Sequence, residues 1–81
     1  MKRLYYYSAA WCGPCQSFGP VMDQVASVIP VVKVNVDYET DLAARANVRS
    51  VPTVILVENE QEVRRFVGAR SFNDVMQFIN G

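Results

Sequence analysis

Apolar residues recur along the chain at two spacings, and the change from one spacing to the other divides the chain into elements. Alternation with a period of two is typical of strands, and steps of three and four residues are typical of amphipathic helices. The pattern predicts seven elements in the order βαβαββα. Strands are expected at 2–8, 31–36, 53–57 and 62–67, and helices at 13–28, 37–46 and 72–79.

The same alternation predicts which way the strand residues face. Leu4 and Tyr6 are expected on one side of the first strand, and Tyr5 and Tyr7 on the other. The segment 53–57 is a continuous apolar run, which is typical of a strand that is buried on both faces. This strand therefore belongs in the middle of a sheet.

Proline, asparagine and serine residues mark the ends of the predicted helices. Pro14 fits a first helical turn, where a missing N–H is tolerated, and Pro20 inside the helix predicts a kink. Asn47 is expected to end the second helix in the left-handed conformation. Ser71 followed by Asp74 resembles a capping box at the start of the last helix.

The order of elements predicts an α/β fold. The first two strands are joined through a helix, so they should be parallel with a right-handed connection. The last two strands form an antiparallel hairpin around 59–61. We expect a mixed four-stranded sheet with helices on both faces, forming a single domain over residues 1–81.

Charge and hydropathy exclude some classes of function. The chain has eight Lys and Arg residues, eight Asp and Glu residues and no basic stripe, which gives little support to nucleic-acid binding. No apolar stretch approaches the roughly 20 residues of a membrane span, and the start lacks the apolar region of a signal peptide. We therefore expect a cytoplasmic protein that binds neither nucleic acid nor membrane.

The two cysteines stand out because the chain has no histidine, the commonest general base and metal ligand. Cys12 and Cys15 lie where the first strand ends and the first helix begins. A structural disulfide between them would close a very short loop and stabilise little. A structural zinc site wants four ligands, and two thiolates would need carboxylates or a second chain to complete it. Neither alternative is favoured, and no metal site is predicted.

The spacing of the cysteines favours thiol–disulfide exchange. Free N–H groups and the positive end of the helix dipole should stabilise the Cys12 thiolate, lowering its pKa below the usual value of about 8.5. Cys15 lies one turn later and is expected to be more buried. Gly13 lets the loop pass close to a partner, and Pro14 stiffens the turn. Cys12 would then attack a target disulfide, and Cys15 would resolve the mixed disulfide.

Together these features resemble the thioredoxin family. The segment Trp11–Cys15 reads Trp-Cys-Gly-Pro-Cys and matches the active site of that family residue for residue. Further agreement is found at Pro20, at Lys33, at the cis-proline segment 51–53 and at 67–69. The resemblance covers nearly the whole chain. It implies a thioredoxin-like fold and a monomeric protein-disulfide reductase that needs no cofactor beyond its own redox-active disulfide. It also implies disulfide-containing target proteins and a thioredoxin-reductase-like electron donor as partners.

The resemblance also implies how targets would bind. A cis bond before Pro52 would bring the Val51 backbone beside Cys12, where it could pair with an extended substrate as an added strand. The alternative is a simple loop proline. Trp11 would lie at the rim of the site, or else pack as a half-buried aromatic. A shallow apolar contact surface would be completed by Val48, Gly68 and Ala69.

The chain departs from the family at several points. It starts without the strand and helix that usually come first, and the turn at 59–62 lacks the usual glycine and looks one residue longer. Tyr6 stands in place of a buried aspartate that is thought to help deprotonate the resolving cysteine. Tyrosine is no ready base at pH 7, so it can at most orient a water or hydrogen-bond Cys15. Lys33 loses its acidic partner and is expected to reach outward or to titrate low.

Two other functions stay open at this point. A glutaredoxin-like, glutathione-dependent reductase fits the chain length but neither the Gly13-Pro14 pair nor the segment 68–71, which lacks a glycine pair. A thioredoxin-fold subunit that only binds a partner is the other alternative, and its thiols would be incidental. Reactivity with a glutathione mixed disulfide would identify the first, and activity without both cysteines would identify the second.

Overall fold

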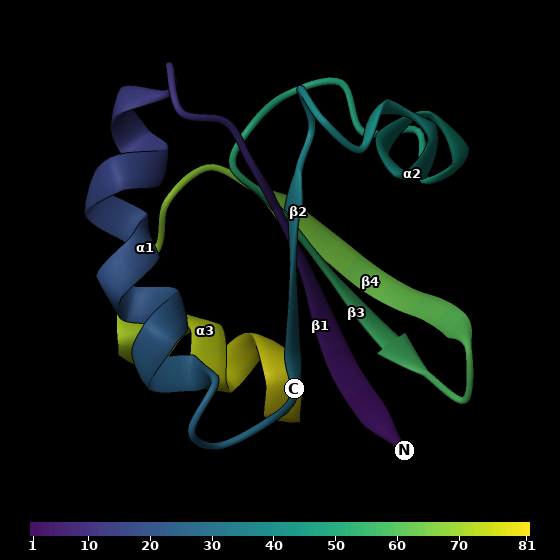
Figure 1. The fold of residues 1–81 in the computed structure, drawn as a ribbon. Coiled ribbons are helices and arrows are strands. Elements are labelled where there is room, and N and C mark those ends of the chain that lie inside the picture. Colours follow the sequence, from purple (N-terminus) through teal and green to yellow (C-terminus); the bar gives the residue numbers. More distant parts are fainter.

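Seven helices and strands follow one another in the predicted order. The computed structural model describes residues 1–81. The strands are β1 (Lys2–Ser8), β2 (Val31–Asn35), β3 (Thr53–Glu58) and β4 (Gln61–Val67), and the helices are α1 (Gly13–Val25), α2 (Thr40–Arg45) and α3 (Phe72–Asn80) (Figure 1). None of the helices is long and apolar enough to cross a membrane.

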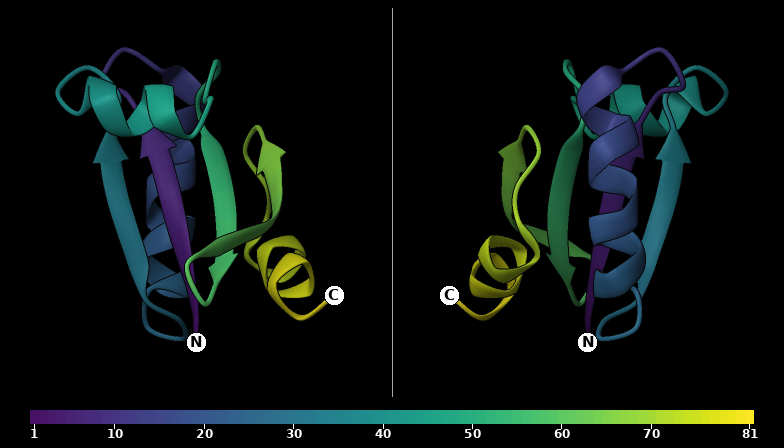
Figure 2. Two further views of the ribbon diagram at one scale, coloured as in Figure 1. Left: turned by 90° about the vertical axis from the view of Figure 1, so that its right-hand side faces the viewer. Right: turned by 90° about the vertical axis from the view of Figure 1, so that its left-hand side faces the viewer.

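The four strands form one mixed sheet in the order β2-β1-β3-β4. β1 and β2 are parallel, whereas β3 is antiparallel to both β1 and β4. Helices α1 and α3 cover one face of this sheet and α2 lies over the other (Figures 1 and 2). The predicted sheet, its hairpin and the helices on both faces are therefore confirmed.

The face under α1 and α3, called the closed face below, carries the main core. Eleven buried residues form one cluster there: Leu4, Tyr6, Phe18, Met22, Val25, Ile29, Val54, Leu56, Phe66, Val75 and Ile79. Phe18 lies at its centre, with edge-to-face contacts to Tyr6 and Phe66 at centroid distances of 5.6 and 6.2 Å. Burial of this apolar surface is the main source of stability for the fold.

The face under α2, called the open face below, is much less covered. Only Tyr7, Val34, Ala43 and Ile55 form a buried cluster there. Because α2 has six residues, it covers only one end of the sheet and leaves the strands below it bare (Figure 2, left). The predicted split of Leu4 and Tyr6 from Tyr5 and Tyr7 is confirmed.

The first two helices are shorter than predicted. α1 ends at Val25 rather than at 28 because its last turn tightens into i→i+3 bonds, such as that from the Val28 N–H to the Val25 carbonyl at 2.9 Å. α2 begins at Thr40 rather than at 37 because Asn35 organises a turn before it. The Asn35 side-chain oxygen accepts from the Asp37 N–H at 2.9 Å.

The hairpin turn differs from its prediction. Asn59 and Glu60 alone form the turn, with φ of 53° and 68°. These positive angles suit the tight turns whose twist matches a hairpin. The turn is one residue shorter than the 59–61 expected from the sequence, and a shift in the pairing between Leu56 and Val57 leaves Val63 as an extra residue inside β4. The expectation that this turn is longer than in the family stays a prediction.

The predicted caps are present at two helix ends. Asn47 follows α2 with a φ of 56°, as expected for a left-handed residue. The Ser71 hydroxyl accepts from the Asp74 N–H at 3.1 Å and caps α3. Pro20 lies inside α1, and the kink there stays a prediction.

Candidate active site

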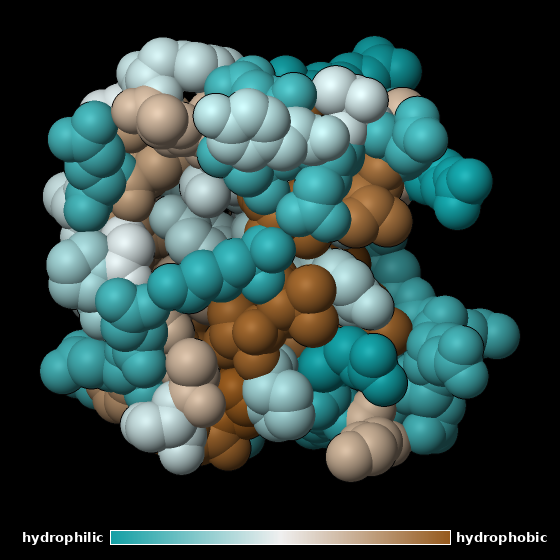
Figure 3. Space-filling model, viewed as in Figure 1, coloured by the Kyte–Doolittle hydropathy of each residue, from teal (hydrophilic) through white to brown (hydrophobic).

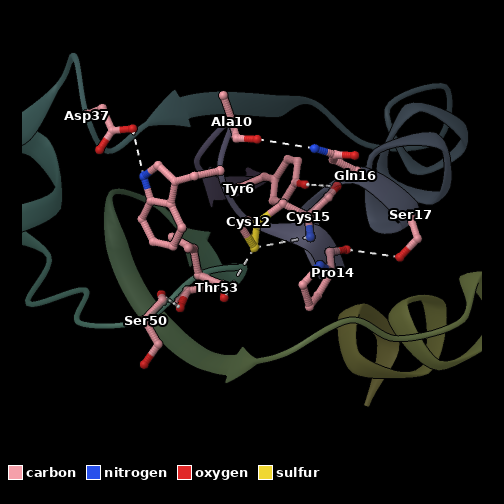
Figure 4. The surroundings of a disulfide bond; sticks show 12 residues. Tyr6, Ala10, Cys12, Pro14, Cys15, Gln16, Ser17, Asp37, Ser50 and Thr53 are labelled. Atoms are coloured by element: carbon pink, nitrogen blue, oxygen red, sulfur yellow. Dashed lines mark hydrogen bonds between the residues drawn. A yellow bond between two sulfur atoms is a disulfide. The ribbon is translucent and has the colours of Figure 1, made fainter.

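The segment Trp11–Cys15 joins the end of β1 to the start of α1. Cys12 and Cys15 form a disulfide there, with their Cα atoms 5.2 Å apart (Figure 4). Cys12 is the N-cap residue of α1, and its Sγ accepts from the Cys15 N–H at 3.2 Å. The sulfur of Cys12 therefore lies at the positive end of the helix, where a negative charge is stabilised.

The expected difference in burial between the two cysteines is not found. Each has 5% of its surface exposed. In this disulfide form, Cys12 packs in one small cluster with Cys15 and Ala9, against Val36 and Val51. The exposure of Cys12 to a partner is thus confined to a small patch of its surface.

The loop before β3 approaches Cys12 from the other side. The bond between Val51 and Pro52 is cis, as the resemblance implied. The carbonyl oxygen of Val51 lies 3.6 Å from the Cys12 Sγ. On the far side of this loop, the Gly68 N–H donates to the Pro52 carbonyl at 2.8 Å. The Val51 carbonyl therefore lies beside the sulfur, and Gly68 holds the loop that carries it.

Trp11 lies at the rim of the site, and the half-buried alternative is wrong. Trp11 has 70% of its surface exposed. The indole Nε1–H donates to the Asp37 carboxylate at 2.9 Å, which holds the ring in place (Figure 4). Behind the ring lies a hollow of about 110 Å³, lined by Trp11, Val36, Val48, Arg49, Ser50 and Val51.

Sequence reasoning missed Asp37, Arg49 and Ser50 at this site. Asp37 lies two residues after the end of β2, and the carboxyl ends of neighbouring parallel strands meet at one edge of a sheet. That rule could have placed Asp37 near the end of β1 and hence near Trp11. Arg49 and Ser50 adjoin the cis-proline segment, so their closeness in sequence to Val51 was the available signal.

Gly13 and Pro14 occupy the first turn of α1. A Cβ added at Gly13 would meet no atom within 4 Å, so this turn is open toward solvent. The Pro14 carbonyl accepts from the Ser17 hydroxyl at 3.1 Å. Gly13 and Pro14 are both exposed, whereas Pro52, the other predicted contact proline, is fully buried.

Tyr6 approaches the disulfide from beneath. It is 3% exposed, and its hydroxyl donates to the backbone carbonyl of Cys15 at 3.2 Å (Figure 4). Burial raises the pKa of Tyr6 above its usual range, so the phenol stays protonated at neutral pH. The expected hydrogen bond to Cys15 is confirmed, and it goes to the backbone rather than to the sulfur.

Lys33 points outward and does not contact the cysteines. Its Nζ lies 2.6 Å from an Asp23 carboxylate oxygen, and both side chains are largely exposed. Of the two fates predicted for this lysine, reaching outward is confirmed. The structure therefore brings Tyr6 to the disulfide and leaves Lys33 at the surface.

The arrangement can perform thiol–disulfide exchange. Two electrons and two protons convert the Cys12–Cys15 disulfide into a dithiol, in which a thiolate is the attacking species. No group of three or more His, Cys, Asp and Glu residues is placed to hold a metal ion. The reactive groups that the structure brings together at this site are the two sulfurs of Cys12 and Cys15.

Comparisons with known proteins agree with this geometry. The family model described as thioredoxin matches residues 2–81. The thioredoxin of Mycoplasma pneumoniae is 40% identical over 82 residues, covering 98% of this chain and 80% of the relative. The thioredoxin of Haemophilus influenzae is 41% identical, covering 95% and 76%. The solved thioredoxin of Fasciola hepatica is 29% identical with a TM-score of 0.90, covering 98% and 78%.

Proposed function

Because this chain belongs to the thioredoxin family of protein-disulfide reductases, with Cys12 and Cys15 as its active-site disulfide, we propose that Cys12 attacks and Cys15 resolves. The observation that carries this assignment is the position of the Cys12 Sγ at the N-cap of α1. It accepts the Cys15 N–H there, and the helix dipole favours its anion. Cys15 lies inside the helix and lacks this position.

The proposed cycle begins with the reduced protein. The Cys12 thiolate attacks one sulfur of a target disulfide, and the other target sulfur leaves as a thiolate. The Cys15 thiolate then attacks the Sγ of Cys12, which releases the second target sulfur and forms the Cys12–Cys15 disulfide. The target gains two electrons, and the pair of cysteines loses two. A separate reductant must return these two electrons before the next cycle.

Targets are proposed to bind in extended form across Cys12. The Val51 carbonyl beside the sulfur supports this, since an extended chain could donate a backbone N–H to it. The exposed residues Trp11, Gly13 and Pro14 are proposed to contact the target on one side and Gly68 on the other. The Pro52 side chain is fully buried, so its proposed role in binding is to shape the loop that presents the Val51 backbone. Binding through backbone groups would read the shape of the target more than its sequence.

The setting of this cycle is also a proposal. The family implies disulfide-containing target proteins and an electron donor, and we propose a thioredoxin-reductase-like protein as that donor. We propose that the protein works in the cytoplasm, as a monomer of one domain. The cytoplasm is a reducing compartment, which would keep the dithiol form of the protein available for attack.

The test is insulin reduction with a small dithiol as the electron source. The wild type should accelerate precipitation of the reduced insulin chains, and Cys12→Ser should not. Cys15→Ser should accumulate a covalent mixed disulfide that a gel shift detects. Ser27→Ala, two residues beyond the far end of α1, is the control and should keep full activity. Equal rates for the wild type and Cys12→Ser would overturn the assignment.

Two further measurements exclude the alternatives. A glutaredoxin-like enzyme would reduce a glutathione mixed disulfide faster than it reduces insulin, and we expect the reverse order. A subunit that only binds would keep its biological activity in a Cys12→Ser, Cys15→Ser double variant. We expect that variant to be inactive.

A further inference from the structure

A second concave site lies on the open face, away from the cysteines. It is a hollow of about 320 Å³ between the end of α2 and the β3–β4 hairpin, lined by Arg3, Tyr5, Tyr7, Ala46, Ile55, Val57, Glu60 and Glu62. The outline of the space-filling view is indented between these two parts (Figure 3). The volume falls at the lower end of the range of about 300–1,000 Å³ that small-molecule sites occupy.

Three hydrogen-bond donors border this hollow without an acceptor. Tyr7 is 4% exposed, yet its hydroxyl makes no hydrogen bond. The Tyr5 hydroxyl and the Arg3 guanidinium also have no hydrogen bond or ion pair. The Tyr7 hydroxyl is not among the fully buried atoms that lack a partner, so it reaches the surface of the hollow, and Arg3 and Tyr5 are half-buried. All three donors are therefore free to bind a ligand that brings an acceptor.

The nearest acceptors on the protein are already used or lie at the outer edge. Both Glu62 carboxylate oxygens accept from Arg65, each at 2.6 Å. Glu60 is exposed in the hairpin turn. Burial and the neighbouring Tyr5 raise the pKa of Tyr7, so its phenol remains a donor. The hollow therefore offers the Arg3 guanidinium and two phenols as donors without a protein partner, and Glu60 is the only lining carboxylate without a cation partner.

The rest of the lining is apolar. Tyr5 and Tyr7 lie with ring centroids 6.5 Å apart and an interplanar angle of 26°, and Ile55 and Val57 continue this floor. Such a surface fits an aromatic or branched aliphatic body. A carboxylate would supply the missing acceptor, since it accepts strong hydrogen bonds from both Arg and Tyr.

We propose that this hollow binds a small carboxylate with an apolar body, held by Arg3 and the Tyr7 hydroxyl and packed against Tyr5, Ile55 and Val57. The site is independent of the disulfide chemistry proposed above. A free acid and the C-terminus of a peptide that ends in an aromatic residue both carry a carboxylate beside an apolar group. Both therefore fit this hollow equally.

The probe is 3-phenylpropionate, titrated by isothermal calorimetry into the full oxidised chain. We expect a Kd of about 4 mM or tighter, since a ligand of about 11 heavy atoms gains at least about 0.3 kcal/mol per heavy atom. Phenethylamine has the same apolar body and the opposite charge, and it should bind at least tenfold more weakly. N-acetyl-glycyl-phenylalanine serves as a third arm. Tighter binding of it than of the free acid would assign the site to peptide C-termini, and weaker binding would assign it to small acids.

Two variants separate this site from non-specific binding. Tyr7→Phe removes one hydroxyl, and Arg3→Gln removes one charge; each should weaken 3-phenylpropionate about tenfold, because hydrogen bonds to a charged group are strong. Lys2→Gln is the matched control, because Lys2 reaches the Ile79 carbonyl at 3.5 Å instead of the hollow, and it should bind as the wild type does. Cys12→Ser should also bind normally. No heat of binding, equal binding of the amine, or unchanged affinity in both variants would overturn the proposal.

Discussion

The closed face and the open face share four strands, but they differ in what covers them. Two helices of 13 and nine residues press on the closed face, and eleven buried residues form its cluster. One helix of six residues lies on the open face, where the buried cluster has four members. Tyr6 and Tyr7 show the contrast at one point of β1. The first finds a hydrogen-bond partner, and the second does not.

The two faces therefore contribute differently to the protein. The closed face provides most of the buried apolar surface that stabilises the fold, whereas the open face leaves polar groups without a partner in the protein. The disulfide lies where the two meet, because α1 carries Cys15 from the closed side and Val51 packs with residues of both the open-face cluster and the disulfide cluster. Substitutions on the two faces should therefore have unequal effects.

The largest effect is expected from a cavity on the closed face. Phe18→Ala should lower the free energy of unfolding by about 3–5 kcal/mol, since it removes a fully buried ring that the neighbours cannot replace. Val32→Ala on the open face, where Val32 is 37% exposed, should cost less than about 1 kcal/mol. Urea denaturation of the oxidised protein measures both. Similar losses for the two variants would contradict the contrast between the faces.

The next effect concerns the chemistry beneath the disulfide. Tyr6→Asp should speed the attack of Cys15 on a mixed disulfide about tenfold near neutral pH. Burial would raise the pKa of the new carboxyl and let it take the Cys15 proton, which the phenol cannot do. Single-turnover release of a reduced target measures this rate. Asn has nearly the same shape as Asp but cannot act as a base, so Tyr6→Asn is the control. An equal rate increase in Tyr6→Asn, or no rate increase in Tyr6→Asp, would count against the idea.

A smaller effect compares two hydroxyl groups on adjacent residues. Tyr6→Phe should lower the free energy of unfolding by about 1 kcal/mol, because it removes a buried hydrogen bond to the Cys15 carbonyl. Tyr7→Phe should be neutral or slightly stabilising, because its hydroxyl has no partner to lose. Denaturant midpoints of the two variants would test this, and a larger loss for Tyr7→Phe would refute it.

The smallest effect depends on pH. The hydrogen bond from Arg65 holds the pKa of Glu62 below its usual value of 4.5. A lowered pKa in the folded state means that this pair stabilises the fold above pH 4.5 and that its contribution disappears as the pH falls below that value. Glu62→Gln should therefore cost at most about 1 kcal/mol at pH 7, since the pair is partly exposed.

The measurement for this pair is the difference in unfolding free energy between Glu62→Gln and the wild type, followed from pH 7 to pH 3. The difference should shrink as the carboxylate of the wild type is protonated. A difference that stays constant over this range would show that the pair contributes through packing instead of charge.

Much of the fold was predictable because the local pattern and the global fold agree. The alternation along β1 separated Tyr6 from Tyr7, and the apolar run of β3 marked the central strand. The ends of α1 and α2 were not predictable. They depend on a tightened last turn near Val28 and on the Asn35 side chain, and residue types alone do not show either.

At the active site, the spacing of Cys12 and Cys15 at the start of a helix by itself determined the chemistry, because reactivity there depends on local backbone groups. Tertiary structure decided the surroundings. Asp37 meets Trp11 across 26 residues, and Val51 meets Cys12 across 39. The hollow on the open face likewise needs Arg3 and Tyr7 from β1 together with Glu62 from β4. Such contacts arise only when separate elements pack, so no short window of sequence contains them.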